Sequence, residues 1–212
     1  MKKPKRKKYE IVCSFDDGFW LDLWVADLLK KYNLSGTFYV VVDWIGQKNY
    51  LTWDNIKGLS RRGFTIGSHS MSHPHDLKKL YDEELHYEIQ NSKDMLETAL
   101  GCHVRSFCYP GGKLNERVKG FVARAGYAEA RVTGEPGITE VKDRLRLPGT
   151  VHIFQRKEYG GKSILEFAKE TIGRVVREGG YCNVWGHSWE LVHRNDFGTL
   201  EEILKYIKRV TK

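Results

Sequence analysis

The sequence predicts an α/β fold of parallel strands, and within that class it favours a (β/α) barrel. Runs of apolar and β-branched residues alternate with helical patterns about seven times, which is typical of parallel strands joined by right-handed crossovers. A doubly wound sheet would satisfy this alternation as well. Four groups of residues, however, each fall just after a predicted strand: Asp16 and Asp17, His69 and His73, Pro110–Gly112, and His187. A barrel gathers the carboxyl ends of its strands on one face. A doubly wound sheet would spread them along a line.

The first third of the chain predicts three strands and two helices. Strands are expected at 9–15, 37–42 and 64–67, where apolar, β-branched and aromatic residues run together, and helices at 21–32 and from Thr52 to about Gly63. Thr52 is the predicted N-cap of the second helix. Asn55 stands where a capping box has Glu or Gln, so we expect that box to be incomplete.

The rest of the chain continues the alternation. Helices are expected at 76–100, 114–125, 164–177 and 200–210, and strands at 104–108, 127–132 and 181–185. Glycines and prolines interrupt any period between 133 and 150, where a short strand at 145–147 is the only element expected.

Length and composition indicate one domain with a basic N-terminal tail. A chain of 212 residues with 41% hydrophobic residues can bury a substantial core, and it has no apolar run long enough for a transmembrane span. Six positive charges fall within residues 1–8, so the formal charge of +8 largely describes that tail. We expect a disordered tail at 1–8 and a single domain at 9–212, with no specific nucleic-acid partner. The oligomeric state is not indicated.

The N-terminus and the cysteines predict a cytoplasmic protein. No apolar segment follows the basic tail as it would in a signal peptide, since the chain runs directly into the first strand. The four cysteines have no CxxC spacing, so a disulfide framework is not expected, in agreement with a reducing compartment.

Two adjacent carboxylates, Asp16 and Asp17, end the first predicted strand. Side by side they repel, and one of them would resist ionisation unless a cation lay nearby. A metal ion would supply that cation, leaving one aspartate to bind it and the other to act on a metal-bound water. The alternative is a solvated turn in which Asp caps the next helix. The pair alone leaves both interpretations open.

His69 and His73 have the i, i+4 spacing of zinc-binding helices. Ser70 stands where such helices carry a general-base Glu, and Pro74 disfavours helical angles at His73. They are therefore predicted to be a loop pair, whose base would be Asp16. Two imidazoles and one carboxylate form a three-ligand set with open positions, as in catalytic zinc sites. Ordinary loop histidines are the alternative.

Four motifs in order along the chain resemble those of one family. They are Ser14–Gly18 (SFDDG), the pair His69 and His73, Phe107–Gly112 (FCYPGG) and Trp185–His187 (WGH). This set is similar to the motifs of the polysaccharide deacetylase (NodB-homology) family, carbohydrate esterase family four, and the resemblance spans about 9–210. It implies a distorted (β/α) barrel of about seven strands. It also implies a metal-dependent hydrolase that removes N-acetyl groups from an amino sugar, an oligosaccharide or a polysaccharide.

The resemblance also implies the roles of individual residues. Asp16 would be the catalytic base and His187 the acid, and the divalent metal ion, usually zinc, would be held by Asp17, His69 and His73. Tyr109, Gly111 and Trp189 would contact substrate, and the N–H of Gly111 would help to stabilise the oxyanion.

Some positions depart from the family pattern. Cys108 stands where many members have an Arg that pairs with the base, and Arg105 or Arg146 is expected to replace it. The fourth motif is not recognisable, and Trp189 and Glu190 are expected to do part of its work. Trp44 and Trp53 are expected to pack in the interior. The five other histidines are expected in surface or capping roles: His75, His86, His103, His152 and His193.

Two other functions remain open from the sequence. The same site could open a cyclic imide or ureide, which is a small amide substrate suited to a cytoplasmic enzyme. A carbohydrate-binding protein without catalysis is disfavoured, because both the base and the acid are present.

Overall fold

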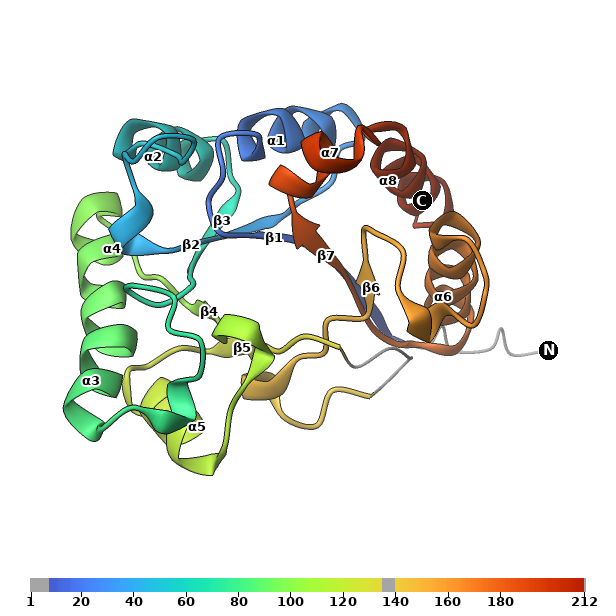
Figure 1. Ribbon diagram of the computed structural model, residues 1–212. Coiled ribbons are helices and arrows are strands. Elements are labelled where there is room, and N and C mark those ends of the chain that lie inside the picture. Colours follow the sequence, from blue (N-terminus) through green and yellow to red (C-terminus); the bar gives the residue numbers. More distant parts are fainter. Residues whose placement is uncertain (1–7, 135–139, 212) are drawn as a thin grey trace.

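The computed structural model describes residues 8–134 and 140–211, and in this part of the chain seven parallel strands form one curled sheet (Figure 1). Their order across the sheet is β5-β4-β3-β2-β1-β7-β6. The strands are β1 (Tyr9–Asp16), β2 (Thr37–Val40), β3 (Thr65–Ser68), β4 (Ser106–Cys108), β5 (Glu129–Arg131), β6 (Val151–His152) and β7 (Gly180–His187). The prediction of an α/β fold with a distorted barrel is confirmed. The predicted tail lies outside the described residues except for Lys8.

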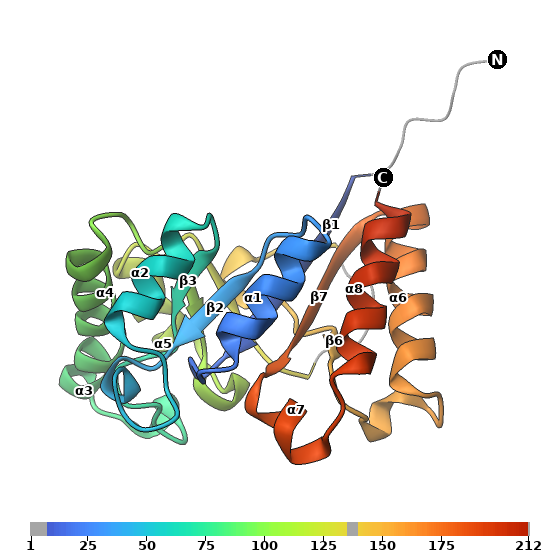
Figure 2. The ribbon, with the colours of Figure 1, turned by 90° about the horizontal axis from the view of Figure 1, so that it is seen from above.

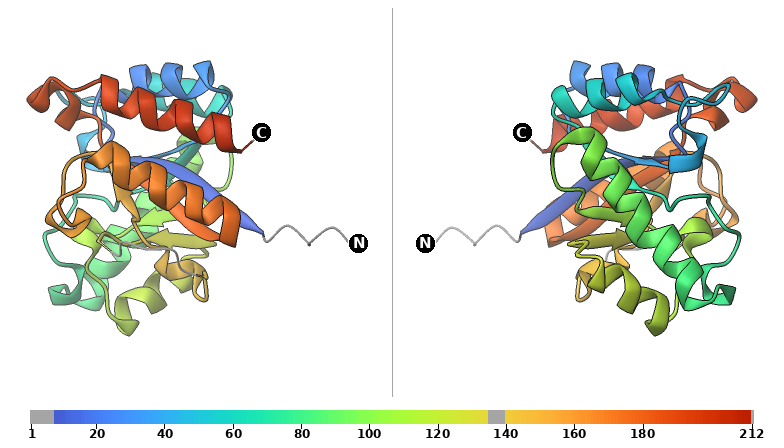
Figure 3. Two further views of the ribbon diagram at one scale, coloured as in Figure 1. Left: turned by 90° about the vertical axis from the view of Figure 1, so that its right-hand side faces the viewer. Right: turned by 90° about the vertical axis from the view of Figure 1, so that its left-hand side faces the viewer.

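The sheet curls into an incomplete barrel. One parallel bridge joins Leu147 to Arg131 of β5, and soon afterwards β6 pairs with β7 at the opposite end of the sheet. The segment from Leu147 to Val151 therefore crosses from one end of the sheet to the other. The helices lie outside the curl, as Figures 1 and 3 show.

Eight α-helices cover the outer surface of the described chain. They are α1 (Asp22–Lys31), α2 (Trp53–Arg61), α3 (Asp82–His86), α4 (Ser92–Leu100), α5 (Glu116–Arg124), α6 (Ile164–Glu178), α7 (Trp189–Arg194) and α8 (Gly198–Val210). Their apolar stripes are completely buried at positions such as Leu29, Ile56, Val122 and Ile172. This burial supplies the main favourable free energy of folding. Within the described ranges, no helix has the length and hydropathy of a membrane span.

Several elements differ from the sequence prediction. The expected helix at 76–100 begins only at α3 and contains a π-helical segment, Tyr87–Asn91, before α4. The expected strand at 145–147 is a 3-10 turn, Arg144–Arg146, while β6 and α7 were not predicted. Both missed elements are too short for a periodic pattern, since β6 has two residues and α7 has six.

The capping box of α2 is complete, contrary to the prediction. The N–H of Thr52 donates to Asn55 Oδ1 over 3.0 Å, and the N–H of Asn55 donates to Thr52 Oγ1 over 3.2 Å. An amide oxygen on the shorter Asn side chain therefore satisfies the same N–H group as a Glu carboxylate would.

The parallel sheet places the ends of all its strands on one edge. Figure 2 shows the segments that follow β1 and β2 on the same edge as α7. Asp16 ends β1, His187 ends β7, and His69 and Pro110 lie directly after β3 and just beyond β4, so the four motifs meet on this edge, as the barrel prediction required.

Candidate active site

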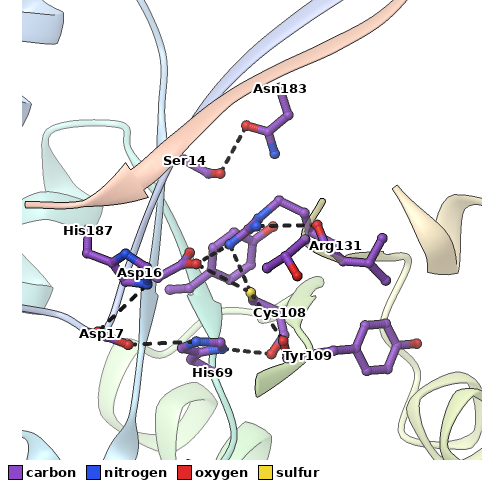
Figure 4. Close-up of polar contacts among 12 residues, drawn as sticks. Ser14, Asp16, Asp17, His69, Cys108, Tyr109, Arg131, Asn183 and His187 are labelled. Atoms are coloured by element: carbon purple, nitrogen blue, oxygen red, sulfur yellow. Dashed lines mark hydrogen bonds and ion pairs between the residues drawn. The ribbon is translucent and has the colours of Figure 1, made fainter. Parts of the chain in front are cut away.

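The two aspartates at the end of β1 have different environments (Figure 4). Asp16 is the last residue of β1 and is only 1% exposed, while Asp17 begins the turn with a φ of +78°. In the parallel register of β1 and β7, Asp16 stands opposite His187. The backbone pairing therefore sets the predicted base beside the predicted acid.

Asp17, His69 and His73 converge at one point. Asp17 Oδ1 lies 3.7 Å from His69 Nε2 and 4.0 Å from His73 Nε2. These separations are too long for hydrogen bonds but close enough for one ion to reach all three atoms. Asp17 Oδ1 is buried and has no hydrogen-bond partner among the described residues. An unpartnered carboxylate oxygen facing two imidazole nitrogens fits a metal ion.

Neighbouring groups orient two of these three side chains. His69 Nδ1 lies 2.8 Å from the carbonyl oxygen of Cys108, which can only accept, so Nδ1 carries the proton and Nε2 presents its lone pair toward Asp17. Burial is the main cause that lowers the pKa of His69 to about 4, so its ring is neutral at pH 7. Trp189 Nε1 donates to Asp17 Oδ2 over 2.9 Å.

The loop from His69 to His73 is held in an unusual conformation. Ser70 and His73 have φ values of +69° and +59°, which side chains other than glycine rarely adopt. The carboxylate of Glu88 accepts hydrogen bonds from the N–H groups of Met71 and Ser72, at 3.0 and 2.9 Å. Glu88 is on the π-helical segment, and such segments are often found at functional sites. The sequence did not indicate this support.

Arg131 of β5 is the partner of Asp16. Its Nη2 donates to Asp16 Oδ2, and the same nitrogen lies 2.9 Å from Cys108 Sγ. Although burial alone would raise the pKa of Asp16, the charge of Arg131 and its hydrogen bond lower it below the usual value. The expectation that Arg105 or Arg146 fills this place is wrong.

Arg131 pairs with Asp16 because of the register between the adjacent strands β4 and β5. β4 and β5 pair with Cys108 opposite Arg131, so an arginine on β5 reaches the base past the small thiol on β4. Its guanidinium is completely buried and lies 4.5 Å from the Trp185 ring. No local motif in the sequence identifies this residue, because it is 115 positions from Asp16.

Glu190 lies between two histidines. Its Oε2 is 3.0 Å from His187 Nδ1 and 3.3 Å from His152 Nε2. Burial alone would lower the pKa of His187, but the hydrogen bond to Glu190 and the charges of Asp16 and Asp17 raise it above the usual value. The predicted contribution of Glu190 thus has a geometric basis.

The prediction of a surface or capping role for His152 is wrong. His152 is 3% exposed, and its Nδ1 accepts a hydrogen bond of 3.2 Å from the N–H of Phe154. Because β6 is two residues long, no periodic pattern in the sequence indicates the strand that carries this side chain into the site.

A cavity of about 310 Å³ adjoins these groups. Its lining includes Asp16, His69, His73, Tyr109, Gly111, Thr133, Thr150, His152, Arg156, Trp185 and His187. Tyr109 donates its hydroxyl to the carbonyl of Leu145 over 3.0 Å, and Gly111 has a φ of +61° in a 3-10 turn. Two of the three predicted substrate contacts therefore line the cavity. The third, Trp189, packs against His187 with ring centres 5.1 Å apart and the ring planes tilted by 33°, and its contact with substrate stays a prediction.

This arrangement combines three chemical capacities in one place. It offers three ligand atoms for a metal ion, an ionised carboxylate in Asp16, and an imidazole in His187 whose protonated form is favoured. A buried carboxylate and a partly exposed imidazole beside a metal position are suited to hydrolysis.

Comparison with known proteins identifies the family of this chain. Residues 3–130 match the family model described as polysaccharide deacetylase. The chain is 28% identical over 111 residues to the peptidoglycan-N-acetylglucosamine deacetylase of Bacillus cereus, covering 51% of this chain and 38% of that protein. The chain spans less than half of the length of the curated relatives that it matches.

Two solved structures extend the comparison. The deacetylase PplD of Streptococcus pyogenes, in complex with acetate, is 26% identical with a TM-score of 0.60, covering 65% of this chain and 62% of that one. A family 4 carbohydrate esterase of Streptomyces lividans, also in complex with acetate, has a TM-score of 0.64 at 16% identity, covering 95% and 87%. The second likeness shows that the fold extends over nearly the whole chain. With its family model matched over more than half of its length, this chain belongs to the polysaccharide deacetylase family, carbohydrate esterase family four.

Proposed function

We propose that the protein is a metal-dependent hydrolase that removes the acetyl group from an N-acetylated amino sugar within a saccharide. The observation that carries the proposal is that Asp16 and His187 stand side by side on β1 and β7, against the cluster of Asp17, His69 and His73. The family and the deacetylase relative from Bacillus cereus support the substrate class.

The metal ion would be held by Asp17, His69 and His73. Two imidazoles and a carboxylate with open positions are a ligand set found in catalytic zinc sites, so zinc is the proposed ion, although other divalent ions can occupy such a set. When bound, such an ion would lower the pKa of water to about 7 and would polarise a carbonyl oxygen.

Asp16 is the proposed base. Arg131 occupies its Oδ2 and keeps the carboxylate ionised, while its Oδ1 is buried without a partner among the described groups. Because Asp16 lines the cavity, that oxygen is positioned to accept the proton of the attacking water.

His187 is the proposed acid. Its Nδ1 is hydrogen-bonded to Glu190, so the protonated ring directs its Nε2–H toward the side of Asp17 and the cavity. Amide cleavage needs this proton, because an amine anion is a poor leaving group. The N–H of Gly111 is the proposed donor to the oxyanion, where such a donor is typically worth about 3–4 kcal/mol. We further propose that 9–212 work as one catalytic domain.

Acetate release from N-acetylglucosamine oligomers tests the proposal directly. The zinc-loaded protein should release acetate, and both chelation and Asp16→Asn should reduce the rate by about 10²-fold or more. Hydantoin serves as the competing substrate. Ring opening of hydantoin without release of acetate from any sugar would contradict the proposal, as would an Asp16→Asn variant as active as the wild type.

A further inference from the structure

The two histidines of the proposed metal cluster are held in different ways. The ring of His69 is oriented by its hydrogen bond to the carbonyl oxygen of Cys108. Among the described residues, no hydrogen bond orients the ring of His73. Its Nε2 lies 4.0 Å from Asp17 Oδ1, and its ring centre is 5.4 Å from that of Trp44. The place of His73 at the metal position therefore depends on the backbone that carries it.

That backbone is strained between the two histidines. Ser70 and His73 have the left-handed φ values of +69° and +59°. Two local hydrogen bonds support this shape, because the N–H of His73 donates to Ser70 Oγ over 3.0 Å and the N–H of Ser70 donates to Ser68 Oγ over 3.1 Å. A strained loop keeps its shape only where its surroundings over-determine it. The loop therefore needs support from outside.

Glu88 supplies support from the helical layer. Its Oε2 accepts hydrogen bonds from the N–H groups of Met71 and Ser72, and its Oε1 accepts one of 2.5 Å from the hydroxyl of Ser72. The carbonyl oxygen of Glu88 also accepts from the N–H of Met71, over 3.1 Å. Glu88 is only 6% exposed, so these bonds have little competition from water. One side chain thus fixes the middle of the loop.

Glu88 itself stands outside the reacting groups. It belongs neither to the ligand cluster nor to the lining of the cavity. It lies on the π-helical segment Tyr87–Asn91, between α3 and α4. Its contacts with the loop are therefore what links this segment to the candidate site.

We propose that Glu88 is a positioning residue that sets the affinity for the metal ion by holding the loop in which His73 faces Asp17. The inference rests on the metal site of the proposed function, and it assigns no contact between Glu88 and the ion. Because the loop is fixed before the ion binds, less conformational freedom is lost on binding. Removing the outer groups that orient metal ligands typically lowers metal affinity by about 10- to 100-fold.

The Kd for zinc tests the inference, measured without substrate by competition with a chromogenic chelator. Glu88→Ala should raise this Kd by about 10- to 100-fold. Glu88→Gln keeps one oxygen that can accept from both N–H groups, but its amide nitrogen cannot accept from Ser72. Its Kd should rise less, by about three- to tenfold. Glu84→Gln is the matched control, because the carboxylate of Glu84 accepts the N–H of Tyr81 at the start of α3, and it should leave the Kd unchanged.

Activity separates positioning from catalysis. For Glu88→Ala, acetate release should be lost at limiting zinc and should return to within about threefold of the wild-type kcat at saturating zinc, with KM unchanged. Thermal unfolding of the metal-free variants identifies any loss due to misfolding, and Glu88→Gln carries the same test if Glu88→Ala does not fold.

Two outcomes distinguish this inference from the proposed function. A lower unfolding temperature for both Glu88 variants with an unchanged Kd for zinc would overturn the role of Glu88, since the side chain would then support the fold alone. A wild type whose zinc affinity depends on Glu88 but which deacetylates no sugar would overturn the proposed function and leave the role of Glu88 intact.

Discussion

The two halves of the candidate site are built in different ways. In the half carried by β1 and β3, the proposed metal ligands Asp17, His69 and His73 come from two short stretches of sequence. In the half carried by β5, β6 and β7, Arg131 pairs with the proposed base, and His152 contacts Glu190, the partner of the proposed acid. Both come from strands that are remote in the chain. The ligand set is thus a local motif, while the environment that controls proton transfer is a product of tertiary packing.

Charge compensation also differs between the halves. Among the described residues Asp17 Oδ1 has no hydrogen-bond partner, so this half leaves a buried carboxylate oxygen available to the proposed cation. In the other half, Asp16 is paired with Arg131, and Glu190 is paired with His187. Substitutions in the metal half should therefore abolish metal binding at little cost in stability, whereas those in the other half should change stability and pH dependence.

The largest effect is expected for Asp17→Asn. Replacing the one carboxylate of the ligand set removes the negative charge that draws the cation between His69 and His73. The bound metal, measured by elemental analysis after dialysis, should be lost, and acetate release should fall by about 10³-fold or more.

Asp43→Asn is the control, because Asp43 is exposed in the segment that follows β2 and is absent from the ligand cluster. It should retain metal and activity. Full metal occupancy in Asp17→Asn would remove the distinction between the two halves.

Arg131→Met should have the largest effect on stability. It leaves the carboxylate of Asp16 buried without its cation, and breaking a buried pair in this way costs about 3–5 kcal/mol. Because the pKa of Asp16 is held below 3.8 in the folded state, the pair stabilises the protein above that pH. The stability difference from wild type should therefore narrow as the pH falls below 3.8. Urea unfolding at several pH values measures it.

Two further variants sharpen this result. Adding Asp16→Asn to Arg131→Met should recover part of the lost stability, since the buried charge is removed. Arg144→Met breaks exposed ion pairs to Glu10 and Glu129 and should cost less than about 1 kcal/mol. If Arg131→Met were as mild as Arg144→Met, the buried pair would not be the stabilising element described above.

The metal half could be predicted from the sequence because its geometry follows from local order. Asp16 and Asp17 end a strand with a clear apolar run, and His69 and His73 follow another. Parallel strands place such ends on one edge whatever the details of packing. The fold class followed from the same alternation of strands and helices.

The support of the site could not be predicted in the same way. Arg131 acts across 115 positions, and its side chain reaches Asp16 alongside Cys108 of the neighbouring strand. Glu88 is brought to the histidine loop by a π-helical segment that no periodic pattern distinguishes from a regular helix. These residues depend on which side chains meet after folding, which one sequence does not specify.

Glu190→Gln should shift the pH dependence of activity. Protonated His187 is the active form of the proposed acid, so activity is lost as the pH rises through its pKa. Glu190 helps to raise that pKa, and its replacement by neutral Gln lowers it. The alkaline limb of the kcat profile should move to lower pH, with a loss of roughly tenfold at pH 8 and less at pH 6. The acid limb, set by Asp16, should stay in place. An unchanged alkaline limb would mean that Glu190 does not act on the acid.

His152→Ala is expected to have the smallest effect, and one opposite in sign. Phe154 donates to Nδ1 of His152, so the neutral ring carries its proton on Nε2, which faces Glu190. Without His152, the Glu190 carboxylate has His187 as its remaining histidine partner, so its charge acts more strongly on His187. The alkaline limb should then move to higher pH, while kcat falls by only about two- to fivefold as the acid loses its fixed orientation.

His152→Gln provides the matched comparison, since its amide can still face Glu190, and it should restore most of the wild-type profile. His103→Ala, at an exposed position, should change nothing. A shift of the limb in the same direction for His152→Ala and Glu190→Gln would show that His152 supports the acid through packing alone. In that case His152 would position Glu190 and His187 by packing, and Glu190 alone would control the pKa of His187.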